Sequence, residues 1–247
     1  MSSVRAGRTF GRSVRLLRGF RDEQRDPDAF YDHLSADAVA QLTPVVRLAG
    51  ALVLDVGGGA GYLTRALRDA GARCVLVDAD LKELSWRGPP LADCVVADAR
   101  ALPIPPGAAD LVVSSNVLEH VSDPFAVVDE MVRVLRPGGH LWISFTNWYG
   151  PWGGHETSPF HYFGGARARR RYLRRTGRDP KNVFGESLFP LHVGTTLRRL
   201  GDDPLLDVVD ARPRYLPECA RGLVGVPVLR EVLTWNLEVL AVKRAAA

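Results

Sequence analysis

The stretch LDVGGGAGYLT, residues 54–64, decides the fold because it joins a strand-like run to a helix-like run through a turn rich in glycine. The run ALVLDV (51–56) is short and apolar, as buried strands are, and GYLTRALRDAG (61–71) has the length and spacing of a helix. Glycines in the turn let the backbone bend tightly and approach a ligand where a Cβ atom would collide. They are Gly57, Gly59 and Gly61. This turn is therefore the first place at which we expect a binding site.

The alternation of strand and helix continues along the chain. Parallel strands joined by helices form right-handed crossovers and place helices on both faces of one sheet. Further strands are expected at 73–78, 94–98, 109–116, 140–145, 205–213 and 234–244. Further helices are expected within 123–139, ending before Pro137-Gly138-Gly139, and at 191–201. We therefore predict an α/β fold with a doubly wound, mostly parallel sheet of seven strands.

The composition narrows the class of protein. With 247 residues and 46% hydrophobic content, the chain can bury a large core. Cys74, Cys94 and Cys219 lack the paired spacing of a zinc site, and three cysteines do not suggest a disulfide scaffold. No stretch approaches the roughly 18 to 20 apolar residues of a membrane span, and the start lacks the apolar block of a signal peptide. We expect a soluble cytoplasmic protein.

Arginine is concentrated in two segments, although the net charge is only +4. The first segment carries arginines spaced three or four apart, which would lie along one face of a helix. They are Arg5, Arg8, Arg12, Arg15, Arg18, Arg21 and Arg25. That face could be solvated, could contact the inner face of a membrane peripherally, or could contact an acidic partner. The second segment, 166–178, could bind phosphate or carboxylate groups or be a solvated face. No nucleic-acid-binding module is recognisable, so we do not expect nucleic acid as a partner.

The glycine turn separates two classes of nucleotide-binding protein. A dinucleotide turn needs glycines spaced G-x-G-x-x-G, but Tyr62 follows Gly57 and Gly59 where the third glycine should stand. The pattern that fits is an acidic residue followed by x-G-x-G-x-G, from Asp55 to Gly61. In this the chain resembles the class I S-adenosylmethionine-dependent methyltransferases, whose first motif has the same form.

The resemblance extends in order over residues 51–146. Asp78 ends the second expected strand, VADARALPIPPGAADLVVSSNVLEHV (96–121) resembles the family's next segment, and RVLRPGGHLWIS (133–144) resembles the turn before the fifth strand. The resemblance implies a Rossmann-like methyltransferase fold with S-adenosylmethionine as cofactor. It assigns the ribose to Asp78 and the adenine to Asp98 and Ala99, and it adds Asn116 and the three glycines to the cofactor-binding residues. Asp55 would either organise the loop or contact the methionine amine, and Tyr31 of FYDHL (30–34) would close over the methionine end.

We predict one methyltransferase domain over residues 1–247. Residues 1–50 form a helical N-terminal cap, 51–146 the cofactor-binding core, 147–190 an acceptor-binding lid inserted after the fifth strand, and 191–247 a C-terminal helix and strands. About 45 residues with little regular pattern is far longer than an ordinary connection, and such loops are often lids or binding loops. The oligomeric state is not predicted.

The lid contains the segment WGGHETSPFHYF (152–163), which crowds histidine, glutamate and aromatic side chains together. We expect acceptor binding by Trp152, Glu156 and Tyr162, and proton transfer by His155 or His161, or by His120 after the fourth strand. His155, Glu156 and His161 could also be considered as metal ligands. Their spacing does not place both histidines on one helical face, and Pro159 prevents a regular helix, so we assign no metal site.

The predicted activity is methyl transfer to a small-molecule, sugar or lipid acceptor, preferably at a hydroxyl oxygen and secondarily at a carboxylate. FRDEQRDPDAFYDHLSAD (20–37) and GGHETSPFHYFGGARARRRY (153–172) also resemble a less characterised actinobacterial branch of the family. Two alternatives remain open. One is aminopropyl transfer on the same fold, for which the acidic polyamine-binding pattern is missing. The other is a non-catalytic module that binds S-adenosylmethionine or a partner.

Overall fold

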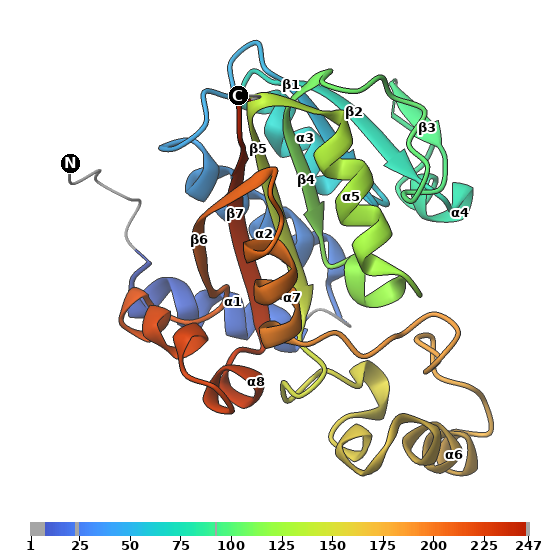
Figure 1. The fold of residues 1–247 in the computed structure, drawn as a ribbon. Helices are drawn as coiled ribbons and strands as arrows, with labels where there is room; N and C mark the ends of the chain where they lie inside the picture. The colour runs from blue at the N-terminus through green and yellow to red at the C-terminus, as the bar shows by residue number, and fades with distance from the viewer. Residues whose placement is uncertain (1–7, 23–24, 92, 246–247) are drawn as a thin grey trace.

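The residues that the structure describes build one twisted sheet with helices on both faces (Figure 1). The structure is a computed structural model, and it describes residues 8–22, 25–91 and 93–245. Seven strands lie in the order β3-β2-β1-β4-β5-β7-β6, and β7 alone runs antiparallel to its neighbours. The strands are β1 (Leu52–Val56), β2 (Arg73–Asp78), β3 (Cys94–Val96), β4 (Ala109–Ser115), β5 (Leu135–Thr146), β6 (Leu206–Pro213) and β7 (Asn236–Lys243).

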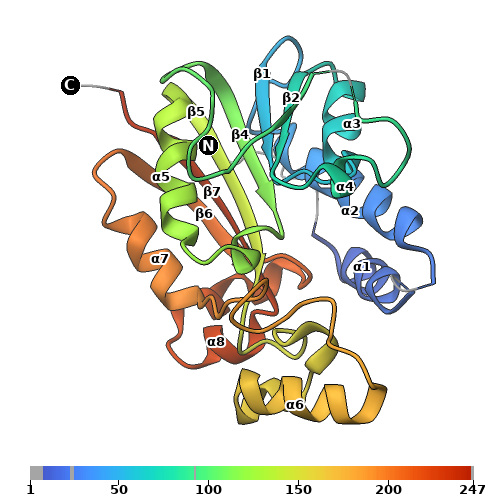
Figure 2. The ribbon, with the colours of Figure 1, turned by 90° about the vertical axis from the view of Figure 1, so that its right-hand side faces the viewer.

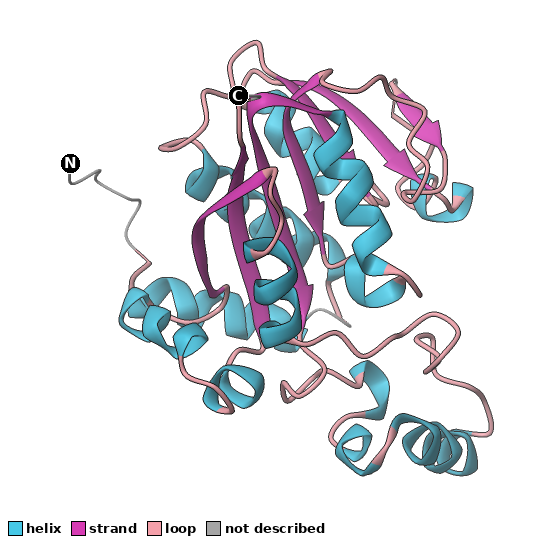
Figure 3. Cartoon of the chain, viewed as in Figure 1, coloured by secondary structure: helices cyan, strands magenta, loops and turns pink. Residues whose placement is uncertain are grey.

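The helices form a layer on each face of the sheet (Figures 2 and 3). Apolar residues of α2 and α3 pack with β1 and β4 on one face, and those of α5 and α7 pack on the other. The α-helices are α1 (Phe10–Asp22), α2 (Pro27–Leu42), α3 (Tyr62–Asp69), α4 (Leu81–Leu84), α5 (Pro124–Val134), α6 (Gly165–Thr176), α7 (Val193–Gly201) and α8 (Leu229–Leu233). Short 3-10 helices are η1 (Leu118–His120), η2 (His155–Thr157), η3 (Phe160–Phe163) and η4 (Glu218–Gly225).

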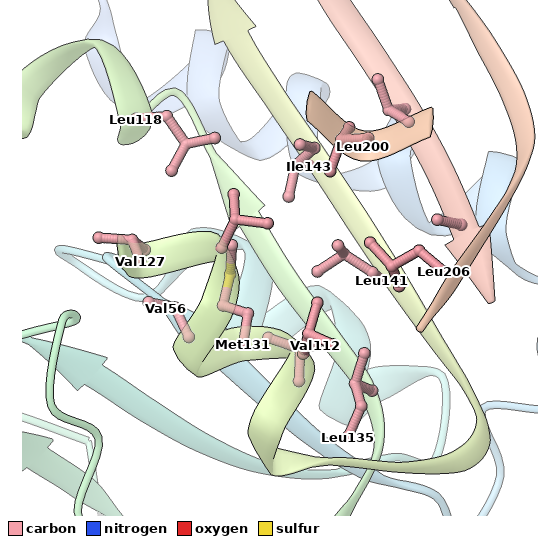
Figure 4. Close-up of a cluster of buried hydrophobic side chains, with 14 of the residues drawn as sticks. Val56, Val112, Leu118, Val127, Met131, Leu135, Leu141, Ile143, Leu200 and Leu206 are labelled. Atoms are coloured by element: carbon pink, nitrogen blue, oxygen red, sulfur yellow. The ribbon is translucent and has the colours of Figure 1, made fainter. Parts of the chain in front are cut away.

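The core follows from the alternation of side chains along the central strands. Val112 of β4 and Ile143 of β5 point to the face that α5 covers, where they meet Met131, and all three are fully buried (Figure 4). Val113, the next residue of β4, belongs to the cluster on the opposite face. Continuous apolar strands of this kind are expected where helices cover both faces of a parallel sheet.

The predicted strands and the doubly wound sheet are confirmed, and one helix is shorter than expected. The helix expected to end before Pro137 ends slightly earlier, at Val134, and Leu135 already begins β5. Pro137 explains the early end, because proline disfavours the helical conformation for the residue before it and has no N–H to donate. At the other end, Asp123 caps α5 by accepting from the Ala126 backbone N–H (3.1 Å).

The N-terminal helical cap is confirmed as α1 and α2, but its arginines do not share one environment. Arg8 and Arg12 are each only 5% exposed. Arg8 pairs with Glu238 of β7, and Arg12 pairs with Asp37 of α2 and donates to the Arg214 carbonyl (3.0 Å).

Other arginines of this segment, such as Arg15 and Arg18, are exposed. Arg5 and the side chain of Arg21 lie outside the described residues. The idea of a uniform arginine face for a membrane or acidic partner is therefore wrong for Arg8 and Arg12, which hold the cap on the sheet. Among the helices of the described residues, none combines the length and apolar character needed to cross a bilayer.

The segment 147–190 has more regular structure than its sequence suggests. It contains η2, η3 and the arginine-rich helix α6. The arrowheads of β4 and β5 point toward the side where this segment and α1 lie (Figures 1 and 2). The carboxyl ends of the parallel strands, where ligands bind in doubly wound folds, therefore face the cap and this segment.

The buried pair of Arg12 with Asp37 gives a test of the cap. Replacing Arg12 with methionine leaves the Asp37 carboxylate and the Arg214 carbonyl without their donors, so we expect the free energy of unfolding to fall by about 3 kcal/mol. Urea denaturation followed by circular dichroism measures this change. Arg15→Met, an exposed position of the same helix, is the matched control and should change stability by less than about 0.5 kcal/mol. Equal stability of the two variants would contradict the assignment.

Candidate functional site

The glycine turn between β1 and α3 is shaped by two close approaches. Gly57 has a φ of +74°, and a Cβ atom there would lie 2.5 Å from a methyl carbon of Val117. A Cβ atom on Gly58 would lie 2.1 Å from Leu76 Cδ1 and 2.6 Å from Asp55 Oδ2. Real Cβ atoms do not approach so closely, so both positions require glycine. Gly59 and Gly61 also have positive φ. Among the described residues, no atom beyond its chain neighbours lies within 4 Å of a Cβ atom built on Gly59, so the space beside the turn is open.

Asp55 lies underneath this turn and is 1% exposed. Its Oδ2 accepts from the Thr64 hydroxyl (2.6 Å). Burial raises the pKa of Asp55 to about 6, and the hydrogen bond from Thr64 opposes that shift. This hydrogen bond agrees with the first of the two roles expected for Asp55, that of organising the loop rather than contacting the methionine amine.

Asp78, at the end of β2, is joined to the same turn. Its Oδ2 accepts from the Gly59 backbone N–H (2.9 Å), and its Oδ1 accepts from the Asp80 backbone N–H (2.9 Å). Partial burial raises the pKa of Asp78. A carboxylate oxygen can accept more than one hydrogen bond, so Asp78 is held in place and can still accept from ribose hydroxyls.

Asp98 and Ala99 follow β3, the strand at one edge of the sheet. Asp98 is exposed, and its two oxygens pair with Arg100 at distances down to 2.7 Å. Hydrogen bonds from Arg100 lower the pKa of Asp98 to about 2. Ala99 is half-buried. The adenine contacts of both residues stay predictions, and any contact of Asp98 would be shared with Arg100.

Asn116 follows β4 in a left-handed backbone conformation, with a φ of 57°. Its backbone N–H donates to the Ser144 carbonyl (2.8 Å), and its Oδ1 accepts from Asn236 Nδ2 (2.8 Å). Asn236 belongs to β7, 120 positions away, and no sequence pattern marks it. The side chain of Asn116 is therefore fixed by a strand that the motif does not include.

Arg214 is a second residue that sequence reasoning missed. It is 1% exposed, and its Nη1 donates to Ser115 Oγ (3.0 Å) and Ser144 Oγ (2.8 Å) at the ends of β4 and β5. Its guanidinium also lies 5.0 Å from the ring centre of Trp142. Arg214 thus ties together the two strand ends that border the site. It lies among many arginines of this chain, so composition gave no signal for it.

Tyr31 stands beside the glycine turn. It comes from α2, and its ring centre lies 5.3 Å from that of Tyr62, the residue after Gly61. Tyr62 in turn donates its hydroxyl proton to Asp28, and Arg87 lies 4.5 Å from its ring centre. The cap therefore presents an aromatic side chain next to the turn, as the prediction for Tyr31 requires.

On the acceptor side, three side chains come together beyond the ends of β4 and β5. We call Glu119, His120 and His155 the histidine–glutamate cluster; each offers one nitrogen or oxygen atom, and these atoms lie within 4.8 Å of one another. The two imidazole ring centres are 5.1 Å apart. Glu119 Oε1 accepts from the Thr146 backbone N–H (2.8 Å), while its Oε2 is buried without a hydrogen-bond partner among the described residues.

The two histidines of the cluster differ in how they are held. His120 Nδ1 contacts the Ser187 carbonyl at 2.8 Å, and since a carbonyl can only accept, Nδ1 carries the proton and Nε2 is left with a free lone pair. His155 has a positive φ of 48°, and its buried Nδ1 has no hydrogen-bond partner in the described part of the chain. Burial, assisted by neighbouring His120, lowers the pKa of His155 to about 4. His155 is therefore neutral near pH 7.

The other predicted acceptor-side residues lie outside the cluster. His161 is 1% exposed, and its Nε2 and Nδ1 contact the Gly150 carbonyl (3.2 Å) and Ser158 Oγ (3.3 Å). Both ring nitrogens are thus used within the segment. Burial also lowers the pKa of His161. The geometry favours a structural role for His161 over the base role predicted from sequence.

Trp152, Glu156 and Tyr162 also make contacts with other residues of the chain. The ring of Trp152 packs edge to face on Trp235, with centres 4.8 Å apart. Glu156 Oε1 accepts from Asn182 Nδ2 (2.9 Å), and the Tyr162 hydroxyl donates to the Tyr149 carbonyl (3.2 Å). Their acceptor contacts stay predictions. His155, Glu156 and His161, the possible metal ligands considered from the sequence, do not come together. Glu156 is hydrogen-bonded to Asn182, and the residues near His155 are Glu119 and His120.

The sheet order, the glycine turn under a helical cap and the acidic end of β2 together define a Rossmann-like methyltransferase. Residues 54–143 match the family described as a methyltransferase domain. An uncharacterized methyltransferase of Mycobacteroides abscessus is 45% identical over 242 residues, which cover 93% of each chain. The chain belongs to this family of methyltransferases. The mycobacterial relative also agrees with the actinobacterial branch suggested by the sequence.

Solved structures with the same fold are more distant. An S-adenosylmethionine-dependent methyltransferase from Mesorhizobium loti aligns with a TM-score of 0.58 and 20% identity, over 86% of this chain and 98% of that one. The magnesium protoporphyrin IX methyltransferase of Synechocystis, with S-adenosylmethionine bound, aligns with a TM-score of 0.54 and 17% identity, over 90% of this chain and 83% of that one. Likeness at this identity shows the fold.

S-adenosylmethionine is the cofactor of this family, and the residues present fit it. The turn has open space at Gly59, Asp78 offers oxygens at the ribose position, and Tyr31 borders the turn from the cap. Together these groups supply the backbone approach and the acidic acceptor that a nucleoside needs.

The close approach at Gly57 predicts a loss of cofactor binding when a methyl group is added. Gly57→Ala places a Cβ atom against Val117 in a strained left-handed conformation, so we expect the dissociation constant of S-adenosylhomocysteine to rise at least about tenfold, or about 1.4 kcal/mol. Isothermal titration calorimetry measures it.

Gly107→Ala is the matched control. Gly107 has a similar φ of +71°, but a Cβ atom built there has no contact closer than 4.0 Å within the described part of the chain. It should bind S-adenosylhomocysteine within about twofold of the wild type. Adding Val117→Ala to Gly57→Ala should recover part of the affinity. Unchanged affinity in Gly57→Ala would show that the turn does not carry the cofactor.

The raised pKa of Asp55 predicts how stability depends on pH. The native state holds a proton on Asp55 up to about pH 6, whereas the unfolded chain releases it near pH 3.8. Native protein therefore binds more protons between these values, and this group's contribution to the free energy of unfolding falls by about 3 kcal/mol as pH rises through the window. Asp55→Asn cannot titrate. The wild type should lose stability relative to Asp55→Asn between pH 4 and 6, measured by urea denaturation; a constant difference would contradict this.

Proposed function

We propose that the protein transfers the methyl group of S-adenosylmethionine to an oxygen atom of a small-molecule, sugar or lipid acceptor. The observation that supports this most is the position of the histidine–glutamate cluster beyond the ends of β4 and β5, beside Asn116. When bound, S-adenosylmethionine supplies a methyl group activated by its sulfonium. The residues around Gly57, Asp78 and Tyr31 would hold the donor, and the cluster would receive the acceptor.

An oxygen acceptor suits this cluster because a hydroxyl must lose its proton during attack. Orientation alone can supply roughly 7 to 11 kcal/mol of the barrier, but a hydroxyl also needs a group that takes or withdraws the proton. His120 Nε2 has a free lone pair because Nδ1 is committed to Ser187, and neutral His155 lies beside it. The cluster therefore offers imidazole nitrogens where the proton would leave.

A lipid or lipid-linked acceptor is supported by one surface feature. Apolar side chains are exposed on and before α8, which lies near the segment 147–190 (Figure 1). They are Val226, Val228, Leu229, Val232 and Leu233. A peripheral contact with the inner face of a membrane would use this patch together with the exposed Arg221.

The acceptor class can be tested by following the methyl group. We expect methyl-labelled S-adenosylmethionine to label material in a fractionated extract of cells that naturally produce the protein, with the polar, lipid and RNA fractions counted separately. A hydroxyl acceptor gives an ether that is stable to alkali, whereas a carboxylate gives an ester that releases methanol in alkali. Tight binding of S-adenosylhomocysteine with no labelled product would favour the non-catalytic module instead.

The cluster predicts a separation between binding and turnover. His120→Ala should lower kcat by at least about 10²-fold, since general bases contribute about 10² to 10⁴, while S-adenosylhomocysteine binds within about twofold of the wild type. Rates are measured with the extract fraction in which the wild type labels an acceptor. His161→Ala is the comparison: it should lower the melting temperature by removing the contact with Gly150. A normal rate in His120→Ala would remove the cluster from the mechanism.

A further inference from the structure

We propose that the histidine–glutamate cluster is a binding site for one divalent cation of the first transition row, such as Zn²⁺ or Mn²⁺. The ligands are the Glu119 carboxylate, one nitrogen of His120 and one nitrogen of His155. Cation binding stands on the geometry of these residues alone. Its use in catalysis rests on the proposed function, because the cation would then bind the acceptor oxygen.

The geometry of the cluster suits a cation. One nitrogen or oxygen atom from each residue lies within 4.8 Å of the others. A cation bound at about 2.1 Å in a tetrahedral arrangement separates its ligands by about 3.4 Å, so each side chain needs to move by about 1 Å or less. Two imidazoles and one carboxylate form a ligand set used for zinc and for other first-row ions.

The strongest support comes from two buried polar atoms that have no hydrogen-bond partner among the residues that the structure describes. Glu119 is 1% exposed, and its Oε2 has no hydrogen-bond partner among the described residues. His155 Nδ1 is likewise buried and unpartnered within them. A buried carboxylate oxygen without a donor costs several kcal/mol, and a cation removes that cost. The two orphaned atoms belong to the same cluster, which is what a ligand held between them would produce.

The atoms around the cluster hold two of its ligands in place. His120 Nδ1 donates to the Ser187 carbonyl, which directs the lone pair of Nε2 away from that contact. Glu119 Oε1 accepts from the Thr146 backbone N–H, which leaves Oε2 for the cation. Ligating histidines usually donate their second N–H to a carbonyl or carboxylate in this way.

Open coordination positions are expected because the described residues supply three ligands. His120 and His155 are only partly buried, so the cluster is open to small ligands. Zinc sites with three protein ligands keep a position for water or substrate, and the cation lowers the pKa of the oxygen bound there. In the proposed function, that oxygen would be the acceptor hydroxyl. With the cation bound, His120 Nε2 would serve as a ligand, and the lowered pKa of the bound hydroxyl would take the place of a base at His120.

The test is metal binding by the whole protein after treatment with a chelator. We expect calorimetric titration with ZnCl2 or MnCl2 to show one bound cation per chain, with Co²⁺ giving the visible absorption of a protein-bound ion. Glu119→Gln and His155→Gln should each weaken binding by more than about tenfold. Glu119→Gln keeps an oxygen for the Thr146 N–H and replaces the second oxygen with an amide NH2, which carries no charge and no lone pair for a cation.

His192→Gln is the matched control. His192 Nδ1 is also buried and unpartnered within the described chain, and the ring stacks on Tyr149 outside the cluster. It should bind the cation like the wild type. Circular dichroism confirms that each variant is folded, and if Glu119→Gln does not fold, His155→Gln decides. No binding by the wild type, or equal binding by His155→Gln and His192→Gln, would overturn the proposal.

Methyl labelling with and without chelator separates this proposal from the proposed function, and the affinity for S-adenosylhomocysteine is the control. A protein that binds the cation through the cluster, but transfers no label to any oxygen, would uphold the cation site and refute the oxygen acceptor. A protein that labels an alkali-stable oxygen at full rate in the presence of chelator would refute the role of the cation. Loss of that labelling on chelation, with S-adenosylhomocysteine affinity unchanged, would support both.

Discussion

The absence of side chains at Gly57 and Gly58 is the constraint on which the rest of the site depends. A Cβ atom at Gly58 would meet both Leu76 and the Asp55 carboxyl, and one at Gly57 would meet Val117. The backbone can therefore cross over a buried acid between β1 and β4, where the strand order reverses. That crossing places the Gly59 N–H against Asp78, so the turn and the end of β2 form one rigid unit.

Much of the fold and of the cofactor side could be predicted because the information is local. Strand, glycine turn and helix lie within a few residues, and the acidic residues follow at the ends of successive strands. Even the shortened helix before β5 has a local cause in Pro137. The relative from Mycobacteroides abscessus and the matched methyltransferase domain agree with what these motifs imply.

The acceptor side could not be predicted because its geometry depends on partners distant in sequence. His155, Glu156 and His161 are neighbours in the chain, yet the backbone directs Glu156 to Asn182 and buries His161 against Gly150. Glu119 and His120, from the other end of the site, join His155 in their place. The local sequence signal for this cluster was the pair Glu119 and His120 soon after the fourth strand. Nothing in the surrounding sequence identified His155 as the residue that joins them.

The ion pair between Arg8 and Glu238 connects residues 230 positions apart, from the start of the cap to the final strand of the sheet. During synthesis, the glycine turn and the five strands that follow one another up to β5 leave the ribosome well before Glu238 is made. Until β7 is made, Arg8 lacks its acidic partner on the sheet, although α2, which carries Tyr31, can already pack on α3 and β1. Fixing the start of the cap to the sheet is thereby coupled to the formation of β7, the strand that lies between β5 and β6.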